Sequence, residues 1–441
     1  MKPFLVKPAL TVPRSRLSLP GDKSIAHRAI ILSSLASGTT IIRNFPANED
    51  CLYTLEAFRK LGVRIASRGK YIKVYGRGSG VFRRPRSAIF VGNSGTTMRL
   101  MMGVLAGCNF RVKLSAAKSL SARPMLRVSA PLRMMGARVT CRRFSSKKEE
   151  YPPVVLHGKN VLLPVTYRIP VASAQVKSAI LLAALNADGL TRLTEPLATR
   201  DHTERMLRFF DAGIKTSGRV IFLKGKSALR SPGILYIPAD ISSASFFMVL
   251  AAIIAGSRIS ITRVGLNPSR LGILRVLKRM GADIKVKKCI LKSAGFEPLG
   301  DITVKGGVLR PVRVSAREIP SLIDELPLLM VAACFADGVS VFKGAEELRV
   351  KETDRIYSVS SNLKRMGADV RVASRGGLDT VIIRGGRVLK GCRIRSFGDH
   401  RTAMSMVIAA LAATGNSVLD DPGCINKSFP GFLSILKRIL R

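Results

Sequence analysis

Two short segments carry residues whose types and spacing could do chemistry, and the richer one is residues 349–355, Arg-Val-Lys-Glu-Thr-Asp-Arg. It places Lys351, Glu352 and Arg355 within about one helical turn. If the segment is helical, Lys351 and Arg355 lie at positions i and i+4 and share a face. Two cations with a carboxylate between them suit a dianionic substrate that also needs proton transfer. A solvated charged surface is the ordinary alternative for such a segment.

The second segment is residues 20–28, Pro-Gly-Asp-Lys-Ser-Ile-Ala-His-Arg. Its glycine predicts a turn that leads into a helix, with Lys23, Ser24 and Arg28 in the first turns of that helix. Backbone N–H groups at a helix N-terminus, together with such side chains, form a binding site for an anion. The two segments together favour a protein that binds and acts on a small anionic molecule.

The composition is that of a folded protein with an unusual charge. The chain has 441 residues, 47% of them hydrophobic, which is enough for two or three domains with sizeable cores. It contains 73 Lys and Arg against 28 Asp and Glu, a formal net charge of +45. Such a charge raises nucleic acid or an anionic membrane as partners. The basic residues are spread from end to end, which disfavours nucleic-acid binding as the main function and leaves nonspecific contact with polyanions open.

Cysteine, histidine and apolar residues argue against several other classes. The seven cysteines are scattered without a Cys-x-x-Cys pair, which disfavours a zinc ribbon or a disulfide framework and favours reduced thiols in a cytoplasm. The four histidines are too dispersed to predict a metal site. The longest apolar stretches, residues 246–255 and 404–413, are shorter than the roughly 20 residues that span a bilayer. We therefore expect a cytoplasmic protein with no metal and no membrane partner, and no secretory signal is evident.

One pattern recurs along the chain: a helical stretch, a glycine-containing turn and an alternating strand. It is seen at intervals of roughly 70–85 residues, with the turns at Gly62, Gly136, Gly213, Gly281 and Gly367. We expect each glycine to occupy the position after the helix C-cap (the C′ position), where a left-handed conformation is needed. A sixth unit at the C-terminus supplies only the helix, in residues 429–441.

Each unit also has a second, more apolar helix. These stretches are rich in Ala, Leu and Met and nearly uncharged past the first turn, so they should be buried. They are residues 26–35, 97–105, 174–185, 243–254, 326–335 and 402–413. Six units with six buried helices predict an α/β protein of two lobes with three units each.

The chain resembles the enolpyruvyl transferase family over essentially its whole length, and most closely the 5-enolpyruvylshikimate-3-phosphate synthases. The motifs that carry the resemblance occur in the family's order, at residues 21–28, 92–99, 123–125, 173–178, 200–205, 324–327, 349–355, 399–401 and 426–430. The resemblance implies a two-lobed enolpyruvyl transferase fold, each lobe three βαβαββ units around buried helices (an inside-out α/β barrel). Lobe one would comprise residues 1–20 and 238–441 and lobe two residues 21–237, with the active site in the cleft between them.

The resemblance also implies a reaction. The enolpyruvyl group of phosphoenolpyruvate would move to the 5-hydroxyl of shikimate 3-phosphate with release of phosphate, by addition and elimination through a tetrahedral intermediate. This is the sixth step of the shikimate pathway, which leads to chorismate and the aromatic amino acids. No metal or organic cofactor would be needed, glyphosate would compete with phosphoenolpyruvate, and the enzyme would act as a monomer.

Roles are implied residue by residue. The positions that match catalytic ones are Asp324, Glu352 and Lys23. Those that match the shikimate 3-phosphate site are Lys23, Ser24, Arg28, Ser173, Ala174, Gln175, Arg200, Asp324 and Lys351. Those that match the phosphoenolpyruvate site are Lys23, Gly95, Thr96, Arg123, Gln175, Arg355, Arg401 and Lys427. Asp324 could instead cap the helix expected from Leu326, and Gly95 could be only a tight turn.

Several positions depart from the family's pattern, and two other functions stay open. Lys118 stands near a position that is usually acidic, and Leu197 and Thr199 lie where His and Ser are usual. The first alternative is a UDP-N-acetylglucosamine enolpyruvyl transferase, which has Lys-Asn where this chain has Lys23-Ser24, and usually a Cys at position 118. The second is a non-catalytic relative that binds anions or nucleic acid, suggested by Lys118 and the net charge.

Overall fold

The computed structural model describes residues 2–9, 11–78, 82–144 and 148–440, and over these residues the chain divides into two compact units. Unit 1 consists of Met1–Pro20, Pro238–Ile290 and Pro298–Arg441, and unit 2 of Gly21–Ile237 and Leu291–Glu297. The short segment Leu291–Glu297 was expected in lobe one. It joins unit 2 because Phe296 is buried in that unit's core and Glu297 pairs with His202 of the same unit.

Unit 2 is built from three repeats. The first repeat comprises α1 (Lys23–Leu35), β3 (Ser37–Arg43), α2 (Glu49–Lys60), β4 (Arg64–Arg68), β5 (Tyr71–Arg77) and β14 (Ile234–Tyr236). The second comprises β6 (Ile89–Phe90), α3 (Gly95–Ala106), β7 (Arg111–Ser115), α4 (Lys118–Ser121), α5 (Leu126–Met134), β8 (Arg138–Arg143) and β9 (Glu150–His157). The third comprises β10 (Thr166–Arg168), α6 (Ala174–Ala184), β11 (Leu190–Thr194), α7 (His202–Phe209), β12 (Ile214–Ser217) and β13 (Val220–Lys224), and the 3₁₀ helix η2 (Lys292–Ala294) also lies in this unit.

Unit 1 has the same plan. Its first repeat comprises β2 (Ser15–Ser18), α8 (Ile241–Ile253), β15 (Arg258–Gly265), η1 (Pro268–Arg270), α9 (Gly272–Arg279), β16 (Asp283–Cys289) and β17 (Leu299–Lys305). The second comprises β18 (Arg313–Val314), η3 (Ile319–Ser321), α10 (Leu326–Cys334), β19 (Val339–Lys343), η4 (Glu346–Val350), α11 (Arg355–Arg365), β20 (Asp369–Arg375) and β21 (Leu378–Arg384). The third comprises β22 (Arg393–Ile394), α12 (His400–Leu411), β23 (Ser417–Leu419), η5 (Pro422–Lys427), α13 (Phe432–Ile439) and the N-terminal strand β1 (Phe4–Val6).

One sheet topology recurs, with four strands in five repeats and with the last strand missing among the described residues in the third repeat of unit 1. The strand orders are β14-β3-β5-β4, β6-β7-β9-β8 and β10-β11-β13-β12 in unit 2, and β2-β15-β17-β16, β18-β19-β21-β20 and β22-β23-β1 in unit 1. In each sheet the first two strands are parallel and every later neighbour is antiparallel. The predicted βαβαββ unit is therefore confirmed in five of the six repeats. Strands from distant parts of the chain complete three of the sheets, because β14 pairs with β3, β2 with β15 and β1 with β23.

The predicted glycine turns are confirmed at four positions and wrong at one. The φ angles are 84°, 95°, 88° and 91° at Gly62, Gly136, Gly281 and Gly367. Gly213 is not in the left-handed region. Helix α7 ends at Phe209 with Phe210 as its C-cap, so the C′ position falls on Asp211, whose φ is 63°. Aspartate tolerates this conformation better than most residues because its short polar side chain can hydrogen-bond locally.

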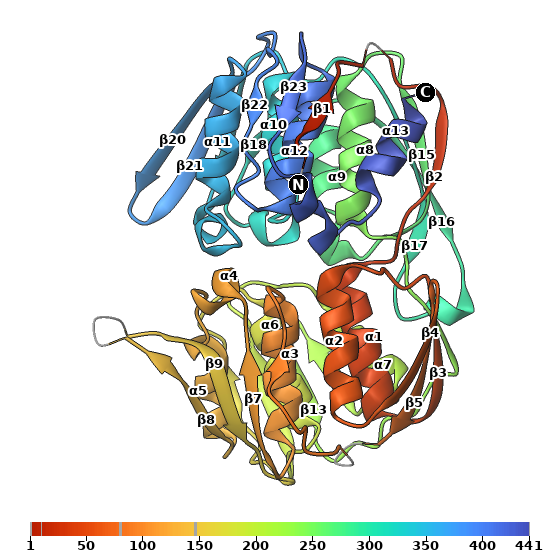
Figure 1. Cartoon of the computed structure of the whole chain (residues 1–441), viewed down its shortest axis with the longest axis vertical. Coiled ribbons are helices and arrows are strands. Elements are labelled where there is room, and N and C mark those ends of the chain that lie inside the picture. Colours follow the sequence, from red (N-terminus) through yellow and green to blue (C-terminus); the bar gives the residue numbers. More distant parts are fainter. Residues whose placement is uncertain (1, 10, 79–81, 145–147, 441) are drawn as a thin grey trace. The chain divides into compact units, whose positions relative to one another are not determined.

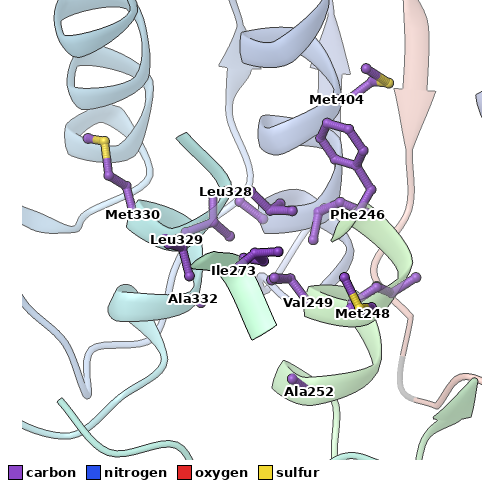
Figure 2. Close-up of a cluster of buried hydrophobic side chains, with 14 of the residues drawn as sticks. Phe246, Met248, Val249, Ala252, Ile273, Leu328, Leu329, Met330, Ala332 and Met404 are labelled. Carbon is purple, nitrogen blue, oxygen red and sulfur yellow. The ribbon is translucent and has the colours of Figure 1, made fainter. Parts of the chain in front are cut away.

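The six apolar helices are buried inside their own units, as predicted. They are α1, α3 and α6 in unit 2 and α8, α10 and α12 in unit 1. In Figure 1, α8, α10 and α12 lie next to one another within unit 1. Figure 2 shows part of that unit's core, where Phe246 and Val249 of α8 lie near Leu328 and Leu329 of α10. No helix in the described part of the chain is long and apolar enough to cross a membrane.

Candidate active site

Three helices of unit 2 begin with predicted site residues. The N-cap side chain of each helix accepts a backbone hydrogen bond: Asp22 Oδ1 from Ile25 N at 2.9 Å, Ser94 Oγ from Thr97 N at 3.2 Å, and Ser173 Oγ from Val176 N at 3.4 Å. The first turns that follow contain Lys23 and Ser24, Gly95 and Thr96, and Ala174 and Gln175. Because a helix N-terminus carries partial positive charge and unpaired N–H groups, these starts favour anions.

The starts of α3 and α6 are joined by a cluster of polar side chains. Arg99 Nη1 donates to Gln175 Oε1 at 2.6 Å, and Gln175 Nε2 donates to Thr96 Oγ1 at 2.9 Å. A Cβ on Gly95 would lie 2.8 Å from Arg123 Nη1 and 3.1 Å from Arg99 Nη1. The glycine therefore allows two guanidinium groups to approach the helix start. The structure thus brings together four predicted phosphoenolpyruvate residues, namely Gly95, Thr96, Arg123 and Gln175.

Arg99 belongs to this cluster although it was not predicted as a site residue. It is buried, and its Nη2 donates to Pro124 O at 3.0 Å, which ties α3 to the Arg123 segment. A signal was present in the sequence, because Arg99 is the lone charge in an otherwise apolar helix and lies four residues after Gly95. A buried cation at that spacing faces the same side as the helix start.

Arg28 is enclosed by hydroxyl groups of unit 2. Its Nε donates to Thr203 Oγ1 at 2.6 Å and its Nη2 to Ser178 Oγ at 2.7 Å, while Nη1 donates to Ser24 O at 2.8 Å. The pKa of Arg28 is lowered to about 10, chiefly by burial and also by the neighbouring Arg200, against the opposing effect of Glu204 and other nearby carboxylates. The structure therefore places Arg28 and Arg200 within electrostatic reach of each other, as a shared phosphate or carboxylate ligand would require.

Lys23, the predicted catalytic cation, is paired within unit 2. Its Nζ lies 3.0 Å from Asp50 Oδ2, and both side chains are largely buried. Asp50 is in the first turn of α2 and was not predicted. The pair fixes the ammonium at the start of α1.

A second buried cation, Lys177, was also missed. Its Nζ lies 3.0 Å from Glu195 Oε2 and 2.6 Å from Glu204 Oε1. Thr199 donates a short hydrogen bond to Glu195. Thr199 is one of the departures from the family's pattern, and its hydroxyl has a structural role here, because it helps to hold the segment that leads to Arg200. Leu197, in the same segment, is exposed, as is Lys118 in α4.

In unit 1, three carboxylates surround Arg355. Its Nε lies 2.9 Å from Asp399 Oδ2, its Nη1 lies 3.5 Å from Asp324 Oδ1, and its Nη2 forms a short contact with Glu352. The guanidinium is buried, which disfavours its charge, but Asp399, Glu352 and Asp324 more than offset this and raise the pKa of Arg355 above its ordinary value. The structure thus brings both predicted catalytic carboxylates of this unit to one cation.

Arg401 completes this cluster. Its Nη1 donates to the backbone oxygen of Asp324 at 3.0 Å, and its Nη2 lies 3.6 Å from Asp324 Oδ2. Asp324 does not cap α10, since the N-cap residue is Glu325. The capping alternative for Asp324 is therefore wrong, and its carboxylate is directed to the two arginines. Lys427 lies apart from these contacts, with its Nζ donating to Gly398 O at 2.8 Å.

The condition that residues 349–355 form a helix is not met. The 3₁₀ helix η4 ends at Val350 with Lys351 as its C-cap, and α11 begins only at Arg355 after its N-cap Asp354. Asp354 accepts from Tyr357 N at 2.9 Å, so capping chemistry sets the helix start. Lys351 and Arg355 do not share a helical face: Lys351 Nζ lies 3.4 Å from Glu347 Oε1 instead. The break lets Glu352 reach Arg355 from a non-helical turn.

No group of three or more His, Cys, Asp or Glu side chains suited to a metal occurs among the described residues. The arrangement consists of cations that can bind phosphate and carboxylate groups, with carboxylates that can move protons.

The fold is that of the enolpyruvyl transferases. The structure superimposes on the enolpyruvyl transferase NikO of Streptomyces tendae with a TM-score of 0.76, covering 99% of this chain and 97% of that one at 18% identity. It is closer to an EPSP synthase of Acinetobacter baumannii, with a TM-score of 0.86 and 41% identity over 100% of this chain and 98% of that one.

The sequence comparisons narrow this class to one family. Residues 13–436 match the family described as EPSP synthase (3-phosphoshikimate 1-carboxyvinyltransferase). The 3-phosphoshikimate 1-carboxyvinyltransferase of Geobacillus thermodenitrificans is 45% identical over 97% of this chain and 96% of its own length. The one of Citrifermentans bemidjiense is 45% identical over the whole of both chains. The chain therefore belongs to the EPSP synthase family, and the resemblance noted in the sequence is confirmed.

Proposed function

We propose that this chain transfers the enolpyruvyl group of phosphoenolpyruvate to the 5-hydroxyl of shikimate 3-phosphate and releases phosphate. Membership of the EPSP synthase family and the names of its full-length relatives support this reaction. The single structural observation that carries it is the Arg355 cluster, in which Asp324 and Glu352 contact one buried cation beside Arg401. Two proton-transfer groups next to two cations match a substrate that is anionic and must be protonated and deprotonated.

The cations of the two units have separate tasks in this proposal. In unit 2, Arg28, Arg200, Ser24, Ser173 and the start of α6 bind shikimate 3-phosphate. Arg123 and Gln175, beside Gly95 and Thr96, bind phosphoenolpyruvate. In unit 1, Arg355, Arg401 and Lys427 contact the same phosphoenolpyruvate, and Lys351 contacts shikimate 3-phosphate. Hydrogen bonds from ionised donors to phosphate and carboxylate oxygens are the strong ones, so these side chains supply both affinity and orientation.

The chemistry is an addition followed by an elimination. In the addition, a base removes the proton of the 5-hydroxyl while an acid protonates the methylene carbon of phosphoenolpyruvate, and the new carbon–oxygen bond gives a tetrahedral intermediate. In the elimination, the carbon–oxygen bond to phosphate breaks and a proton leaves the methyl group, which regenerates the enol ether. Asp324 and Glu352 carry these proton transfers, with Lys23 assisting. Arg355 contacts both carboxylates and keeps them in place.

The two alternative functions are less well supported. The chain has Lys23-Ser24 and Lys118 at the positions where the UDP-N-acetylglucosamine enzymes would have Lys-Asn and usually a Cys. Lys118 is exposed in α4. The contacts described around Gly95 and around Arg355 do not involve Lys118. A non-catalytic relative would have no need of the carboxylates that Arg355 holds.

We also propose that the protein works in a cytoplasm. All seven cysteines are free thiols, and Cys51, Cys108, Cys334 and Cys424 are buried. Burial raises the pKa of the Cys108, Cys334 and Cys424 thiols to about 12, which keeps them protonated and unreactive. Such thiols suit a reducing compartment.

A phosphate-release assay tests the proposed reaction. We expect phosphate to appear only when phosphoenolpyruvate and shikimate 3-phosphate are both present, and the other product to contain the enolpyruvyl ether. Replacement of shikimate 3-phosphate by UDP-N-acetylglucosamine should abolish release. Phosphate release with the nucleotide sugar, or no release with shikimate 3-phosphate, would contradict the proposal.

A further inference from the structure

The outer face of the first sheet of unit 2 has an unusual composition. Strands β3, β4, β5 and β14 point Ile42, Ile65, Ile72, Val74 and Leu235 into the core. Helices α1 and α2 pack on that inner side, as Figure 1 shows. The alternate positions point outward, and we call eight of them the tyrosine–arginine face: Arg43, Arg64, Arg68, Tyr71, Lys73, Tyr75, Arg77 and Tyr236.

This face combines positive charge with aromatic rings. It holds five cations, and no outward position of its four described strands is Asp or Glu. It also holds three of the chain's seven tyrosines. Charge alone would not single it out, because the outer faces of other sheets are basic too. On the β16–β17 hairpin, however, Lys287 lies opposite Asp301 and Lys305 lies opposite Asp283. Of these two surfaces, only the tyrosine–arginine face combines tyrosine side chains with cations that have no acidic residue opposite them on the neighbouring strand.

The rings and cations alternate in space. Arg64 pairs across the sheet with Tyr75, Arg68 with Tyr71, and Arg43 with Tyr236. The Arg64 guanidinium carbon lies 4.6 Å from the centre of the Tyr75 ring, and Lys73 Nζ lies 5.0 Å from the same ring. Tyr71 is 57% exposed and lies four residues before Tyr75 on the same strand, so both side chains are on one side of the sheet, with Cα atoms about 13 Å apart.

We propose that the tyrosine–arginine face binds single-stranded nucleic acid. Tyr71 and Tyr75 would stack on bases, and the arginines and lysine around them would contact the phosphates. A nucleic acid strand presents planar bases and anionic groups in alternation, which is the pattern of this face, and an aromatic side chain or a guanidinium plane can stack on any base. An anionic membrane fits less well, because the aliphatic residues at the outward positions are limited to Ala66, Ile41 and Ile234, too few to insert into a bilayer.

Binding of a fluorescent 12-nucleotide single-stranded RNA to the full chain tests this proposal. In Y71L/Y75L the charge is unchanged and the rings are lost, so we expect the Kd to rise about 10–100-fold. In R64Q/R68Q two phosphate contacts are lost, so the slope of log affinity against log salt should fall by about 1.4. The matched control K285Q/K287Q removes two cations from β16 and should change the Kd less than about threefold. Phosphate release by the enzyme should be the same in all three variants, which also shows that each is folded.

Three results would overturn the proposal. One is an RNA affinity that Y71L/Y75L leaves unchanged. Another is an equal loss of affinity in K285Q/K287Q and R64Q/R68Q, which would mean that net charge alone retains RNA. The third is tighter binding to phosphatidylserine vesicles than to RNA with the same dependence on Tyr71 and Tyr75, which would assign the face to membranes. A duplex of the same length should bind without dependence on the two tyrosines, because its bases are already stacked.

Discussion

Arg355 contacts three carboxylates that come from three places in the sequence. Glu352 is three residues away, but Asp324 and Asp399 are brought to it by separate segments of unit 1. Removing one partner from a buried ion pair costs more than the pair itself contributes, because the remaining charge is left without compensation. Substitutions in this cluster should therefore be chosen to preserve shape and hydrogen bonding, so that an effect on chemistry can be separated from an effect on folding.

Glu352→Gln and Asp324→Asn should each reduce kcat by about 10²–10⁴-fold, the usual contribution of a proton-transfer group. Both amides keep the shape of the side chain, so the Kd for shikimate 3-phosphate, measured by calorimetry, should change only severalfold. Glu347→Gln is the control, because it removes a carboxylate that pairs with Lys351 rather than with Arg355. Near-normal turnover in both amide variants would remove these carboxylates from the mechanism.

Gly95→Ala should impair glyphosate inhibition more than catalysis. The added methyl group would lie 2.8 Å from Arg123 Nη1, so this guanidinium would have to shift. Such overpacking should raise the KM for phosphoenolpyruvate and raise the inhibition constant of glyphosate, the longer molecule, by a larger factor. Gly307→Ala is the control, because no atom lies within 4 Å of its added Cβ. Equal insensitivity of the wild-type chain and Gly95→Ala to glyphosate would show that Gly95 does not shape the pocket.

At the scale of the element, five of the six repeats have a tight turn after their more polar helix. Four of these use glycine in the left-handed region, and the third repeat of unit 2 uses Asp211. A non-glycine residue in this region is strained by its Cβ atom, even when the side chain is short and polar. In the third repeat of unit 2, the residue after the helix C-cap is therefore aspartate instead of glycine, but its backbone has the same left-handed conformation.

Asp211→Gly should stabilise the protein by about 0.5–1 kcal/mol, since the relief of strain exceeds the greater freedom that glycine has in the unfolded chain. The reciprocal change Gly136→Asp should destabilise it by a similar amount, because Gly136 has a φ of 95° and no atom closer than 3.9 Å to an added Cβ. Thermal unfolding of both variants measures the difference. A lower melting temperature for Asp211→Gly would show that the aspartate side chain stabilises the turn by its own contacts.

The contact of β9 with α5 and β8 depends on Glu150. Its carboxylate accepts from Arg133 Nη2 at 2.9 Å and Arg143 Nη2 at 2.5 Å, and it contacts Ser129. Burial favours the neutral acid, but these hydrogen bonds prevail and lower the pKa of Glu150 to about 2. Because the folded-state pKa lies below the unfolded one, this stabilisation is complete above about pH 4.5 and is lost as the pH falls toward 2.

Glu150→Gln should therefore destabilise the protein by about 1–3 kcal/mol at pH 7, and the difference from the wild-type chain should shrink between pH 4.5 and pH 2. Denaturant unfolding at several pH values would measure it. Glu56→Gln is the control, because Glu56 pairs with Arg59 at an exposed site, where such pairs contribute less than about 1 kcal/mol. A pH-independent difference for Glu150→Gln would mean that packing, and not the charge, matters at this position.

At the scale of the whole molecule, the proposed site residues are divided between the two units. Lys23, Arg123 and Gln175 belong to unit 2, and Asp324, Arg355 and Arg401 belong to unit 1. In the proposed reaction these groups act on one pair of substrates. Closure around a substrate is a common way to exclude water from such chemistry and to complete a binding site.

Shikimate 3-phosphate should therefore draw the two units together and create most of the phosphoenolpyruvate site. Small-angle scattering should show a smaller radius of gyration at saturating shikimate 3-phosphate, and the affinity for phosphoenolpyruvate should rise. Inorganic phosphate at the same concentration is the control, because it lacks the carboxylate and hydroxyl groups of shikimate 3-phosphate. An unchanged scattering profile at saturation would contradict closure.

The amino-acid sequence by itself determined the repeats and the six buried helices, and its family motifs nominated most residues of the candidate site. Hydrophobic periodicity is a local property, and the helix starts proposed to bind anions are short motifs such as residues 21–28 and 92–99, so both can be recognised without knowledge of tertiary contacts. The sequence was least informative where the conformation depends on neighbours, as in residues 349–355, which could have been helical but are interrupted by two caps.

Only the tertiary structure decided which residues are partners. Arg99 with Gln175, Arg28 with Thr203 and Arg355 with Asp399 are separated by 76, 175 and 44 residues, and no local pattern encodes such pairs. No local pattern shows that Leu291–Glu297 belongs to unit 2 either. That assignment follows from the burial of Phe296 and the contact of Glu297 with His202. The physical reason is that a buried charge or ring is stabilised by whichever complementary group the packing of the repeats brings to it, and that packing is a property of the whole unit.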